Sequence, residues 1–251
     1  ASYLLHVLSG LKDYNVSTFQ AEDEIAAICA AIGASYGGAM GITSSSGPGV
    51  ALKTEALGLA IAAELPLILV NSQRAGPSTG MPTKTEQSDL YLALYGRNAD
   101  APLVVLAPRS SSDCFDIGIN AVKIATQFMT PVMILSDTYL VNAAEPWLLP
   151  DVNKIDPFPV AFRTDPEGFH PFLRDTKTGA RPWVKPGTPD LTHRIGGLER
   201  ASDSGDVSYD PNNHQNMTNA RRDKIHGIAK FLPPQEIDLG SDNGQVAVVG
   251  W

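Results

Sequence analysis

The sequence predicts an α/β fold for residues 1–145, a parallel β-sheet with helices on both faces. Two observations predict it. Short runs that are apolar at every position alternate with longer segments whose apolar residues recur at helical spacing. Strands that are apolar on both faces are typical of parallel sheets, because helices cover both sides of such sheets. The breaks between the segments contain Gly, Ser and Pro, as expected for connecting turns.

The first elements are two helices with a strand between them. Residues 2–8 have a helical rhythm, and we expect a strand over residues 16–20. A helix over residues 22–36 follows, because its apolar side chains recur at helical spacing. These side chains are Ile25, Ile28, Cys29 and Ile32.

Strands and helices then alternate up to residue 135. We expect a short strand over residues 39–43, a helix over 50–63 and a strand over 66–70, where the sequence Pro-Leu-Ile-Leu-Val is continuously apolar. A polar stretch without periodicity, residues 71–89, interrupts the pattern. The remaining expected elements are a strand over 103–107, a helix over 112–128 and a strand over 132–135.

The second part of the chain has a different composition. Residues 151–251 contain 10 of the 19 prolines. We therefore expect residues 146–240 to form an extended, loop-rich arm that lies against a partner subunit, with one helix near residues 217–231. Disorder is the alternative, and four apolar side chains favour anchoring instead. They are Trp183, Ile195, Leu198 and Tyr209.

Both ends of the sequence have the pattern of regular structure. Residues 2–8 are helical from the start, and residues 245–251 have the pattern of a buried strand. A buried strand needs neighbours with which to pair. We expect residues 241–251 to be the first strand of a further domain that is truncated here, and the first strand and loop of residues 1–145 to be missing.

Charge and cysteine content exclude several classes of protein. The net charge is −8 and the pI about 5.0, which argues against nucleic acid and against anionic membranes as partners. There is no apolar run of about 20 residues and no secretion signal. Cys29 and Cys114 lie far apart in apolar helical patterns, so we expect buried thiols in the reducing cytoplasm. Without a CxxC pair, we expect no metal site or iron–sulfur cluster on this chain.

Ligands of open parallel sheets bind beyond the carboxyl ends of the strands, and three loops of this chain are expected there. The first contains Glu22, Asp23 and Glu24 at the start of a helix. Acidic residues at this position often only complement the helix dipole. Glu24 is followed by apolar or small residues, however, and a carboxylate on the buried side could share a proton with a ligand nitrogen.

The second loop, residues 43–49, has the sequence Thr-Ser-Ser-Ser-Gly-Pro-Gly directly before a helix. Glycines let backbone N–H groups approach a ligand, and a helix N-terminus adds partial positive charge. Ordinary turn chemistry is the alternative. The loop matches neither the dinucleotide pattern GxGxxG nor the phosphate loop ending in Gly-Lys-Ser/Thr, which disfavours nicotinamide and nucleoside triphosphate ligands.

The third loop, residues 73–87, is long for a connection, and long loops are often functional. It supplies two cations, Arg74 and Lys84, to an otherwise acidic domain. A substrate with a carboxylate would need such a group. The alternative is that Lys84 is a solvent-exposed lysine without a role.

Several motifs now identify a family. In order along the chain, the sequence resembles the alpha subunit of 2-oxoacid:ferredoxin oxidoreductases, most closely the 2-oxoglutarate type, and the resemblance covers nearly the whole chain. The motifs are QAEDEIAA at residues 20–27, GASY at 33–36, TSSSGPG at 43–49, QR at 73–74, the run 76–89, CFD at 114–116, residues 131–137, RPW at 181–183, PGTP at 186–189 and HRIGGLE at 193–199.

The resemblance implies a thiamine diphosphate-binding fold, with this domain holding the aminopyrimidine half of the cofactor. It implies that one glutamate hydrogen-bonds the ring nitrogen N1′. In thiamine enzymes this glutamate tends to precede a helix glycine by nine positions, and Gly33 lies nine positions after Glu24. Glu24 is therefore the expected catalytic acid and Glu22 the fallback. Ser46, Gly47 and Gly49 are the further expected cofactor neighbours.

The resemblance also implies partners. The Gly-Asp-Gly motif that binds diphosphate and Mg²⁺ in these enzymes is absent, since Gly205-Asp206-Val207 lacks the third glycine. A beta subunit is expected to supply that motif together with an iron–sulfur cluster. The implied reaction is oxidative decarboxylation of 2-oxoglutarate or a related 2-oxoacid, with coenzyme A taking the acyl group and ferredoxin the electrons. Lys84 is the candidate for the distal carboxylate, with Arg74 and Thr79 as further substrate-binding residues.

Two other functions remain open at this stage. One is a non-catalytic assembly subunit, in which the glutamates only cap a helix. The other is a thiamine diphosphate-dependent transferase that does not use ferredoxin.

Overall fold

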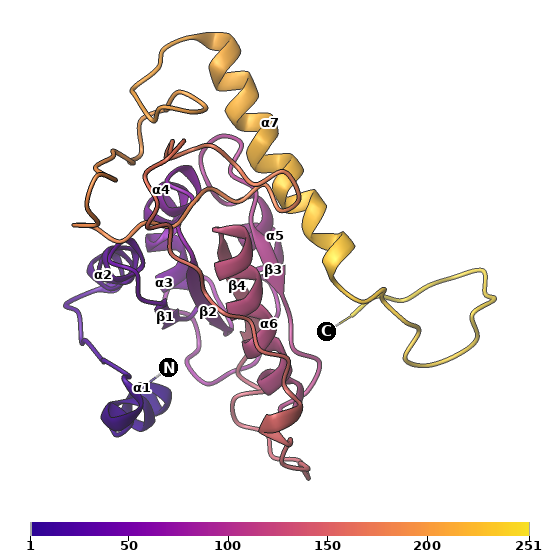
Figure 1. The fold of residues 1–251 in the computed structure, drawn as a ribbon. Coiled ribbons are helices and arrows are strands. Elements are labelled where there is room, and N and C mark those ends of the chain that lie inside the picture. The colour runs from indigo at the N-terminus through magenta and orange to yellow at the C-terminus, as the bar shows by residue number, and fades with distance from the viewer. Residues whose placement is uncertain (1, 251) are drawn as a thin grey trace.

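The computed structural model describes residues 2–250, and its centre is a four-stranded parallel sheet (Figure 1). In spatial order the strands are β1 (Gly41–Ser45), β2 (Leu67–Gln73), β4 (Pro131–Asp137) and β3 (Val104–Leu106). Leu69 of β2 lies beside Thr43 on one side and Met133 on the other. Across the described residues, no helix is both long and apolar enough to span a membrane.

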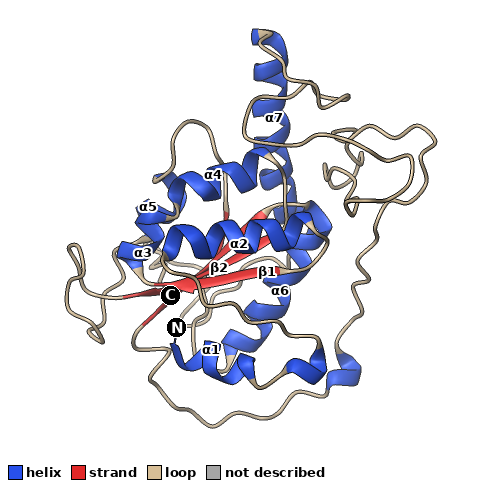
Figure 2. Ribbon diagram, turned by 90° about the vertical axis from the view of Figure 1, so that its left-hand side faces the viewer, coloured by secondary structure: helices blue, strands red, loops and turns tan. Residues whose placement is uncertain are grey.

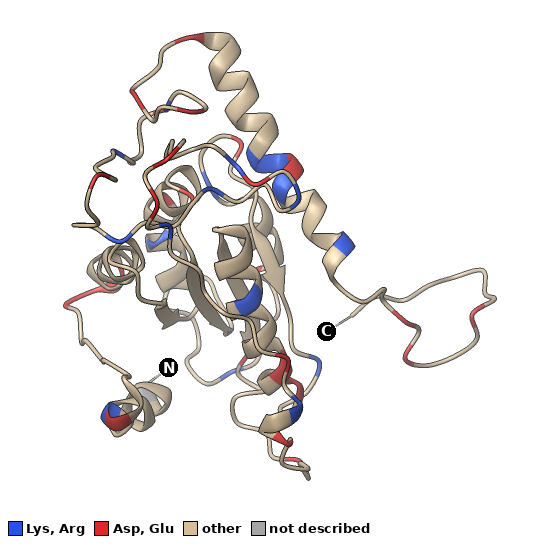
Figure 3. Ribbon diagram, in the orientation of Figure 1, with Lys and Arg blue, Asp and Glu red and all other residues tan. Residues whose placement is uncertain are grey.

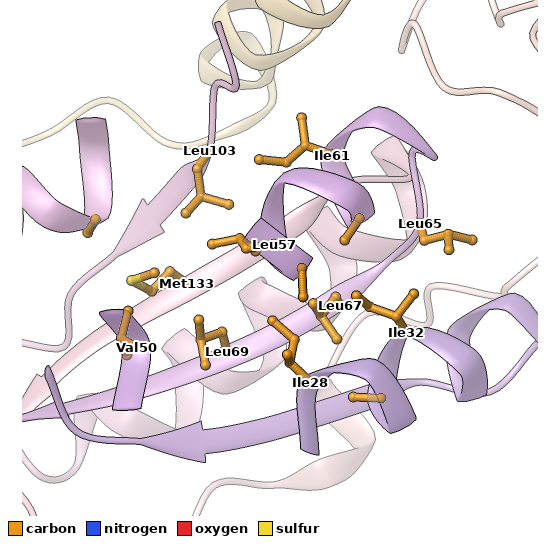
Figure 4. Close-up of a cluster of buried hydrophobic side chains, with 14 of the residues drawn as sticks. Ile28, Ile32, Val50, Leu57, Ile61, Leu65, Leu67, Leu69, Leu103 and Met133 are labelled. Atoms are coloured by element: carbon orange, nitrogen blue, oxygen red, sulfur yellow. The ribbon is translucent and has the colours of Figure 1, made fainter. Parts of the chain in front are cut away.

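Helices cover both faces of the sheet, as the continuous apolar strands predicted (Figure 2). α2 (Glu24–Tyr36), α3 (Gly47–Leu52), α4 (Thr54–Ala62) and α5 (Leu90–Tyr95) pack on one face, and α6 (Asp113–Phe128) on the other. Alternate residues of β2 therefore belong to two hydrophobic clusters, one on each face of the sheet. Leu67 and Leu69 face the first cluster (Figure 4), whereas Ile68 faces the second, beside Phe128. The predicted fold class is confirmed.

Most predicted elements form, with shifted boundaries. β1 begins two residues later than expected, and β2 and β4 extend further toward their carboxyl ends. The helix expected over residues 50–63 is two helices, α3 and α4, with Lys53 between them. α1 (Ser2–Ser9) forms as expected and is followed by a short 3₁₀ turn, η1 (Lys12–Tyr14).

The strand expected over residues 16–20 is wrong. This segment is coil, and Phe19 has 65% of its surface exposed. The run contains two apolar residues, Val16 and Phe19, which do not alternate as one face of a strand requires. Within the described residues no segment pairs with the outer edge of β1, whose Ile42 is 52% exposed.

Residues 245–250 are exposed coil in the structure, and the expectation that residues 241–251 form the first strand of a further domain stays a prediction; Trp251 lies outside the described residues. The expectation that the two cysteines are buried is wrong. Cys29 and Cys114 are exposed thiols rather than buried ones. Each lies on the outward side of its helix, where the apolar pattern is wider than the buried stripe.

The loop-rich arm follows β4 and folds back over the domain. It is coil apart from η2 (Val152–Lys154), α7 (Pro211–Ile228) and η3 (Ala229–Phe231). Trp183 is 5% exposed and donates its Nε1–H to the Ser35 carbonyl at 3.1 Å. Ile195 packs partly buried against the first core cluster. Leu198 and Tyr209, in contrast, are 56% and 89% exposed and do not anchor the arm to this chain.

A buried ion cluster fastens the arm to the end of α4. Glu64 is 1% exposed and accepts a hydrogen bond from Lys224 Nζ of α7 at 2.6 Å and another from Arg174 of the arm. Arg181 Nε donates to the backbone carbonyls of Ala63 and Glu64. Burial alone would raise the pKa of the Glu64 carboxyl, but the charges of Lys224 and Arg174 outweigh it and hold that pKa below its usual value.

Charged residues lie mostly outside the sheet, on loops, on the arm and along helices such as α6 and α7 (Figure 3). Among the strand residues, Asp137 at the carboxyl end of β4 carries the one charge. The interior of the sheet is therefore apolar, and its polar chemistry is concentrated at the edge where the strands end.

Candidate functional site

A pocket of about 440 Å³ opens at the carboxyl ends of the strands. Because the strands are parallel, the segments that follow β1 and β2 meet at this edge. The lining residues come from the start of α3 and from the long loop after β2. They are Gly47, Pro48, Arg74, Gly76, Pro77, Ser78, Glu86, Ser88 and Asp89.

Glu24 is the first residue of α2 and lies partly buried beside the start of α3. Asp23 is the N-cap, and its carboxylate accepts a hydrogen bond from the Ala26 N–H at 2.7 Å. The capping role therefore belongs to Asp23, which leaves the Glu24 carboxylate available. Glu22 is exposed to solvent.

Gly49 lets three elements approach one another. A Cβ atom at this position would lie 1.9 Å from Ser45 Oγ, 2.8 Å from Glu24 Cγ and 3.0 Å from Glu24 Oε1. Such distances are far below van der Waals contact, so Gly49 is required for the observed position of Glu24. The structure thus brings Glu24 and Gly49, two of the predicted site residues, into direct proximity.

Gly47 and Ser46 occupy the adjoining turn. A Cβ at Gly47 would lie 2.6 Å from an oxygen of the Asp89 carboxylate, so this glycine admits Asp89 into the pocket wall. Ser46 precedes α3 as its N-cap, without a side-chain cap hydrogen bond. Gly47 therefore lies at the pocket and Gly49 beside Glu24, with Ser46 directly before them in the chain.

Arg74 lines the pocket from the end of β2. Its Nε is buried, and no hydrogen-bond partner for this atom is present in the described chain. Asn71 Oδ1 and Ser136 Oγ, at the carboxyl ends of β2 and β4, are also buried without a hydrogen-bond partner in the described chain. Unpaired buried polar atoms are costly, at about 1–3 kcal/mol each, so this edge is suited to a polar ligand.

The long loop after β2 folds back on itself. The Ala75 N–H donates to the Lys84 carbonyl at 2.9 Å, and the Met81 N–H donates to the Ala75 carbonyl at 2.9 Å. Gly76 N–H donates to Glu86 Oε2 at 3.0 Å, which lowers the pKa of that carboxyl. Thr79 and Lys84 are exposed on this loop and do not line the pocket among the described residues.

Three polar residues of the site were not predicted. Asn71 and Gln73 are fully buried at the end of β2. Asn71 Nδ2 donates to Asp89 Oδ2 at 3.0 Å, and Gln73 Oε1 accepts from the Asp89 N–H at 3.0 Å. Together they fix Asp89 at the pocket. The sequence feature that could have indicated Asn71 and Gln73 is their alternate spacing directly after a continuous apolar strand.

A fourth unpredicted residue is Lys53, which is 1% exposed between α3 and α4. Its Nζ donates to Thr43 Oγ1 of β1 at 2.8 Å. Burial lowers the pKa of this ammonium, and the carboxylates of Glu24 and Asp23 act in the opposite direction. The sequence feature that could have indicated a buried Lys53 is a lysine within an apolar helical pattern.

Comparisons with known proteins agree on one family. The matching family model is described as pyruvate flavodoxin/ferredoxin oxidoreductase, thiamine diphosphate-binding, and it matches residues 4–209. The chain is 54% identical over 251 residues to the 2-oxoglutarate oxidoreductase subunit KorA of Mycobacterium tuberculosis, covering 100% of this chain and 38% of that protein. It is 34% identical over 260 residues to subunit alpha of 2-oxoacid:ferredoxin oxidoreductase 1 of Aeropyrum pernix, covering 100% of this chain and 40% of the relative.

A solved structure gives the same result. The 2-oxoglutarate:ferredoxin oxidoreductase from Magnetococcus marinus, with 2-oxoglutarate, coenzyme A and succinyl-CoA bound, is similar with a TM-score of 0.85 at 34% sequence identity. The likeness covers 94% of this chain and 41% of that one. The present chain therefore spans about two fifths of the length of the relatives that it matches over its whole extent.

Proposed function

Since this chain belongs to the pyruvate flavodoxin/ferredoxin oxidoreductase family of thiamine diphosphate-binding domains, we propose that it is the part of a 2-oxoacid:ferredoxin oxidoreductase alpha subunit that holds the aminopyrimidine half of the cofactor. The proposed reaction is the oxidative decarboxylation of 2-oxoglutarate to its coenzyme A thioester. The observation that carries the proposal is the position of Glu24 beside Gly49 and Ser45.

The residues present fit the cofactor. A Cβ on Gly49 would overlap Ser45 Oγ and approach Glu24, so this glycine allows both side chains to lie at the start of α3. Unpaired buried atoms of Asn71, Arg74 and Ser136 lie at the same edge of the sheet. Thiamine diphosphate, when bound, supplies the carbon nucleophile and the electron sink that decarboxylation of a 2-oxoacid requires.

Glu24 is proposed to exchange a proton with the N1′ ring nitrogen of the aminopyrimidine. Its side chain is partly buried, which restricts the access of water to the carboxylate. Asp23 already caps α2, which frees Glu24 from that structural task. A correctly placed acid of this kind contributes roughly 10²–10⁴ in rate.

Arg74 is our preferred residue for a carboxylate of the substrate, because it lines the pocket and its buried Nε lacks a partner in the described chain. Guanidinium groups bind carboxylates in a planar, bidentate manner. Lys84 and Thr79 remain proposed substrate residues for the distal carboxylate. They are exposed here, so they would need to turn toward the pocket when substrate binds.

The remaining components are proposed to come from partners. A beta subunit would supply the diphosphate and Mg²⁺ site together with an iron–sulfur cluster, and ferredoxin would accept the electrons. The support is family membership and the absence from this sequence of a Gly-Asp-Gly motif and of a CxxC pair. Two unpaired cysteines agree with a cytoplasmic location.

The test is to co-express the full-length subunit with its beta partner and to compare Glu24→Gln with Glu22→Gln. Glu22 is the matched control, because it is an exposed glutamate two residues upstream. We expect Glu24→Gln to lose about 10²-fold or more of coenzyme A-dependent dye reduction and to weaken thiamine diphosphate binding, with assembly intact. Unchanged turnover in Glu24→Gln would refute the assignment.

The same preparation separates the two other functions. An assembly subunit would bind no thiamine diphosphate at Glu24, so Glu24→Ala would leave cofactor binding by the complex unchanged. A transferase without ferredoxin would co-purify without an iron–sulfur partner.

Substrate specificity is tested with Lys84→Ala and Arg74→Ala. Lys84→Ala should impair 2-oxoglutarate turnover far more than that of a monocarboxylic 2-oxoacid, whereas Arg74→Ala should impair both.

A further inference from the structure

A second pocket, of about 820 Å³, lies at the opposite edge of the sheet from the candidate site. Met129 and the end of α6 line it, and Met129 lies two residues before β4 begins. Because the strands are parallel, this is the edge at which they start. The remaining lining residues lie in two stretches of the arm, within 158–163 and within 173–183, which cross this end of the domain (Figure 1).

Much of the wall of this pocket is apolar. Phe158 and Phe162 line it from the first stretch of the arm, and Leu173 and Trp183 from the second. The rings of Phe162 and Trp183 contact each other, with their centroids 4.9 Å apart, and Trp183 is also fixed by its hydrogen bond to the Ser35 carbonyl. Pockets of this size with aromatic walls are typical of binding sites for small organic molecules.

Cations dominate the buried part of the pocket. Arg174 and Arg181 line it, and Lys224 belongs to the same ion cluster. Across the residues that the structure describes, Glu64 is the one carboxylate that forms an ion pair with any of these three cations, and it pairs with Arg174 and Lys224. Arg181 is 3% exposed, and its hydrogen bonds go to backbone carbonyls rather than to a carboxylate.

The cluster keeps an excess of positive charge. The C-terminal ends of α4 and α6 each add roughly half a negative charge, through the carbonyls of Ala63 and Met129. With the single charge of Glu64, these helix ends leave about one positive charge of the three uncompensated. Burial lowers the pKa of Arg181 to about 10, against the effect of Glu64, so the guanidinium is still charged at neutral pH. A buried charge without a counter-charge is costly, and this one lies beside a pocket.

Two further charged residues line the pocket, and they do not change this balance. Arg163 and Asp175 have opposite charges, and both reach solvent. Each is bonded within its own turn: Arg163 donates to the carbonyls of Asp165 and Glu167, and Asp175 accepts from Thr178.

We propose that this pocket is a binding site for a small aromatic carboxylate. Its ring would lie against Phe158, Phe162 and Leu173, and its carboxylate at the end of the pocket where Arg174 and Arg181 lie. A single negative charge would balance the excess charge of the cluster. Because its walls come from the arm and from α6, a bound ligand would also hold the arm against the domain. The site does not depend on the role of Glu24.

The test is calorimetric titration of the assembled complex of the full-length subunit and its beta partner with three probes. We expect 1-naphthoate to bind saturably, with one site per alpha subunit. The neutral amide 1-naphthamide has the same ring and should bind at least about tenfold more weakly, because it lacks the charge-assisted contribution. Inorganic phosphate has no ring and should not bind at the same concentrations.

Leu173 allows the charge preference to be tested without altering the buried cluster, because it is 56% exposed at the pocket. Leu173→Glu brings a carboxylate to the site and should weaken 1-naphthoate binding about tenfold, since like charges repel, whereas the neutral Leu173→Gln should keep most of the affinity. Leu198→Glu is the matched control, because Leu198 is also 56% exposed on the arm but does not line this pocket.

Arg181→Met tests the cluster itself. It removes the cation that has no carboxylate partner, so the affinity for 1-naphthoate should fall about tenfold while that for 1-naphthamide stays unchanged. If Arg181→Met does not assemble, the comparison of Leu173→Glu with Leu173→Gln still decides between binding of an anion and binding of a ring alone.

Three outcomes would overturn the proposal. They are the absence of saturable 1-naphthoate binding, which is also expected if another part of the assembled enzyme fills the pocket, equal affinities for the acid and the amide, and equal losses in Leu173→Glu and Leu198→Glu. Glu24→Gln should leave 1-naphthoate binding unchanged, and Leu173→Glu should leave coenzyme A-dependent dye reduction unchanged. The proposed function and this second site can therefore fail independently.

Discussion

Replacing Glu64 with Gln should loosen the arm from the α/β domain. The Glu64 carboxylate is 1% exposed and is the counter-charge of Lys224, whose side chain is 2% exposed, and of Arg174. Glutamine keeps the size and one acceptor oxygen but removes the negative charge. Two cations would then be left buried without a neutralising partner, which is the costly arrangement for an ion pair in a protein interior.

The size of the effect follows from this burial. Breaking a buried ion pair by removing one partner costs about 3–5 kcal/mol, whereas surface pairs contribute about 0–1 kcal/mol. The side chains of Glu64 and Lys224 are almost inaccessible to solvent, so the range for buried pairs, about 3–5 kcal/mol, applies. The stabilisation also depends on pH. Because the folded-state pKa of Glu64 is held below its usual value, its contribution is present above the ordinary carboxyl pKa and is lost as pH falls through the folded value.

Hydrogen exchange of the full-length subunit measures the opening free energy of residues 174–183 and of α7. Glu55→Gln is the matched control, because Glu55 is exposed on the adjacent helix, and we expect it to change these values by less than about 0.5 kcal/mol. In the Glu64→Gln background, Lys224→Met should cost less than it does in the wild type, since its partner is already gone. An opening free energy within about 1 kcal/mol of wild type in Glu64→Gln, or strict additivity of the two changes, would refute the reasoning.

Two further predictions concern the site and the arm. Gly49→Ala would place a Cβ 1.9 Å from Ser45 Oγ and displace Glu24, so thiamine diphosphate affinity should fall by about tenfold or more, measured by titration of the assembled complex. Gly118→Ala on α6 is the control, because nothing lies within 4 Å of the added Cβ, and it should leave the affinity for thiamine diphosphate unchanged. Equal affinities in the two variants would contradict the predicted clash between the new Cβ and Ser45. Trp183→Phe removes the 3.1 Å hydrogen bond to the Ser35 carbonyl. The free energy of amide protection near residue 35, measured by hydrogen exchange, should fall by about 1–2 kcal/mol. Unaltered protection there would count against Trp183 as an anchor of the arm.

The sheet was predictable because its strands are buried on both faces. β2 and β4 each begin with a continuous apolar run, and such a run has few alternatives in a chain that also contains amphipathic helices. The strand expected over residues 16–20 failed because strand formation depends on a pairing partner, and local sequence does not reveal one. The exposure of Cys29 has a similar reason, since its helix has more apolar residues than the core covers.

The candidate site was predictable where topology alone places residues. Glu24, Gly47 and Gly49 lie in the first turns of α2 and α3, and α3 directly follows β1 at the edge where parallel strands end. The position of Lys84 depends instead on backbone hydrogen bonds within a loop, such as the one from Ala75, which composition does not specify. Lys53 was missed because a lysine in an apolar helix resembles a solvated residue until a neighbouring strand buries it.

The buried cluster around Glu64 also has a consequence for the order in which this chain folds. Glu64 and Lys224 are separated by 160 residues, so the carboxylate leaves the ribosome long before its counter-ion has been synthesised. Until α7 is synthesised, Glu64 lacks the counter-charge of Lys224, and we expect its carboxylate to stay in water. We expect stalled nascent chains that end before residue 224 to be cut by protease near residue 64, and chains that extend past α7 to resist. The arm would then act during synthesis as the last step that completes the domain it covers.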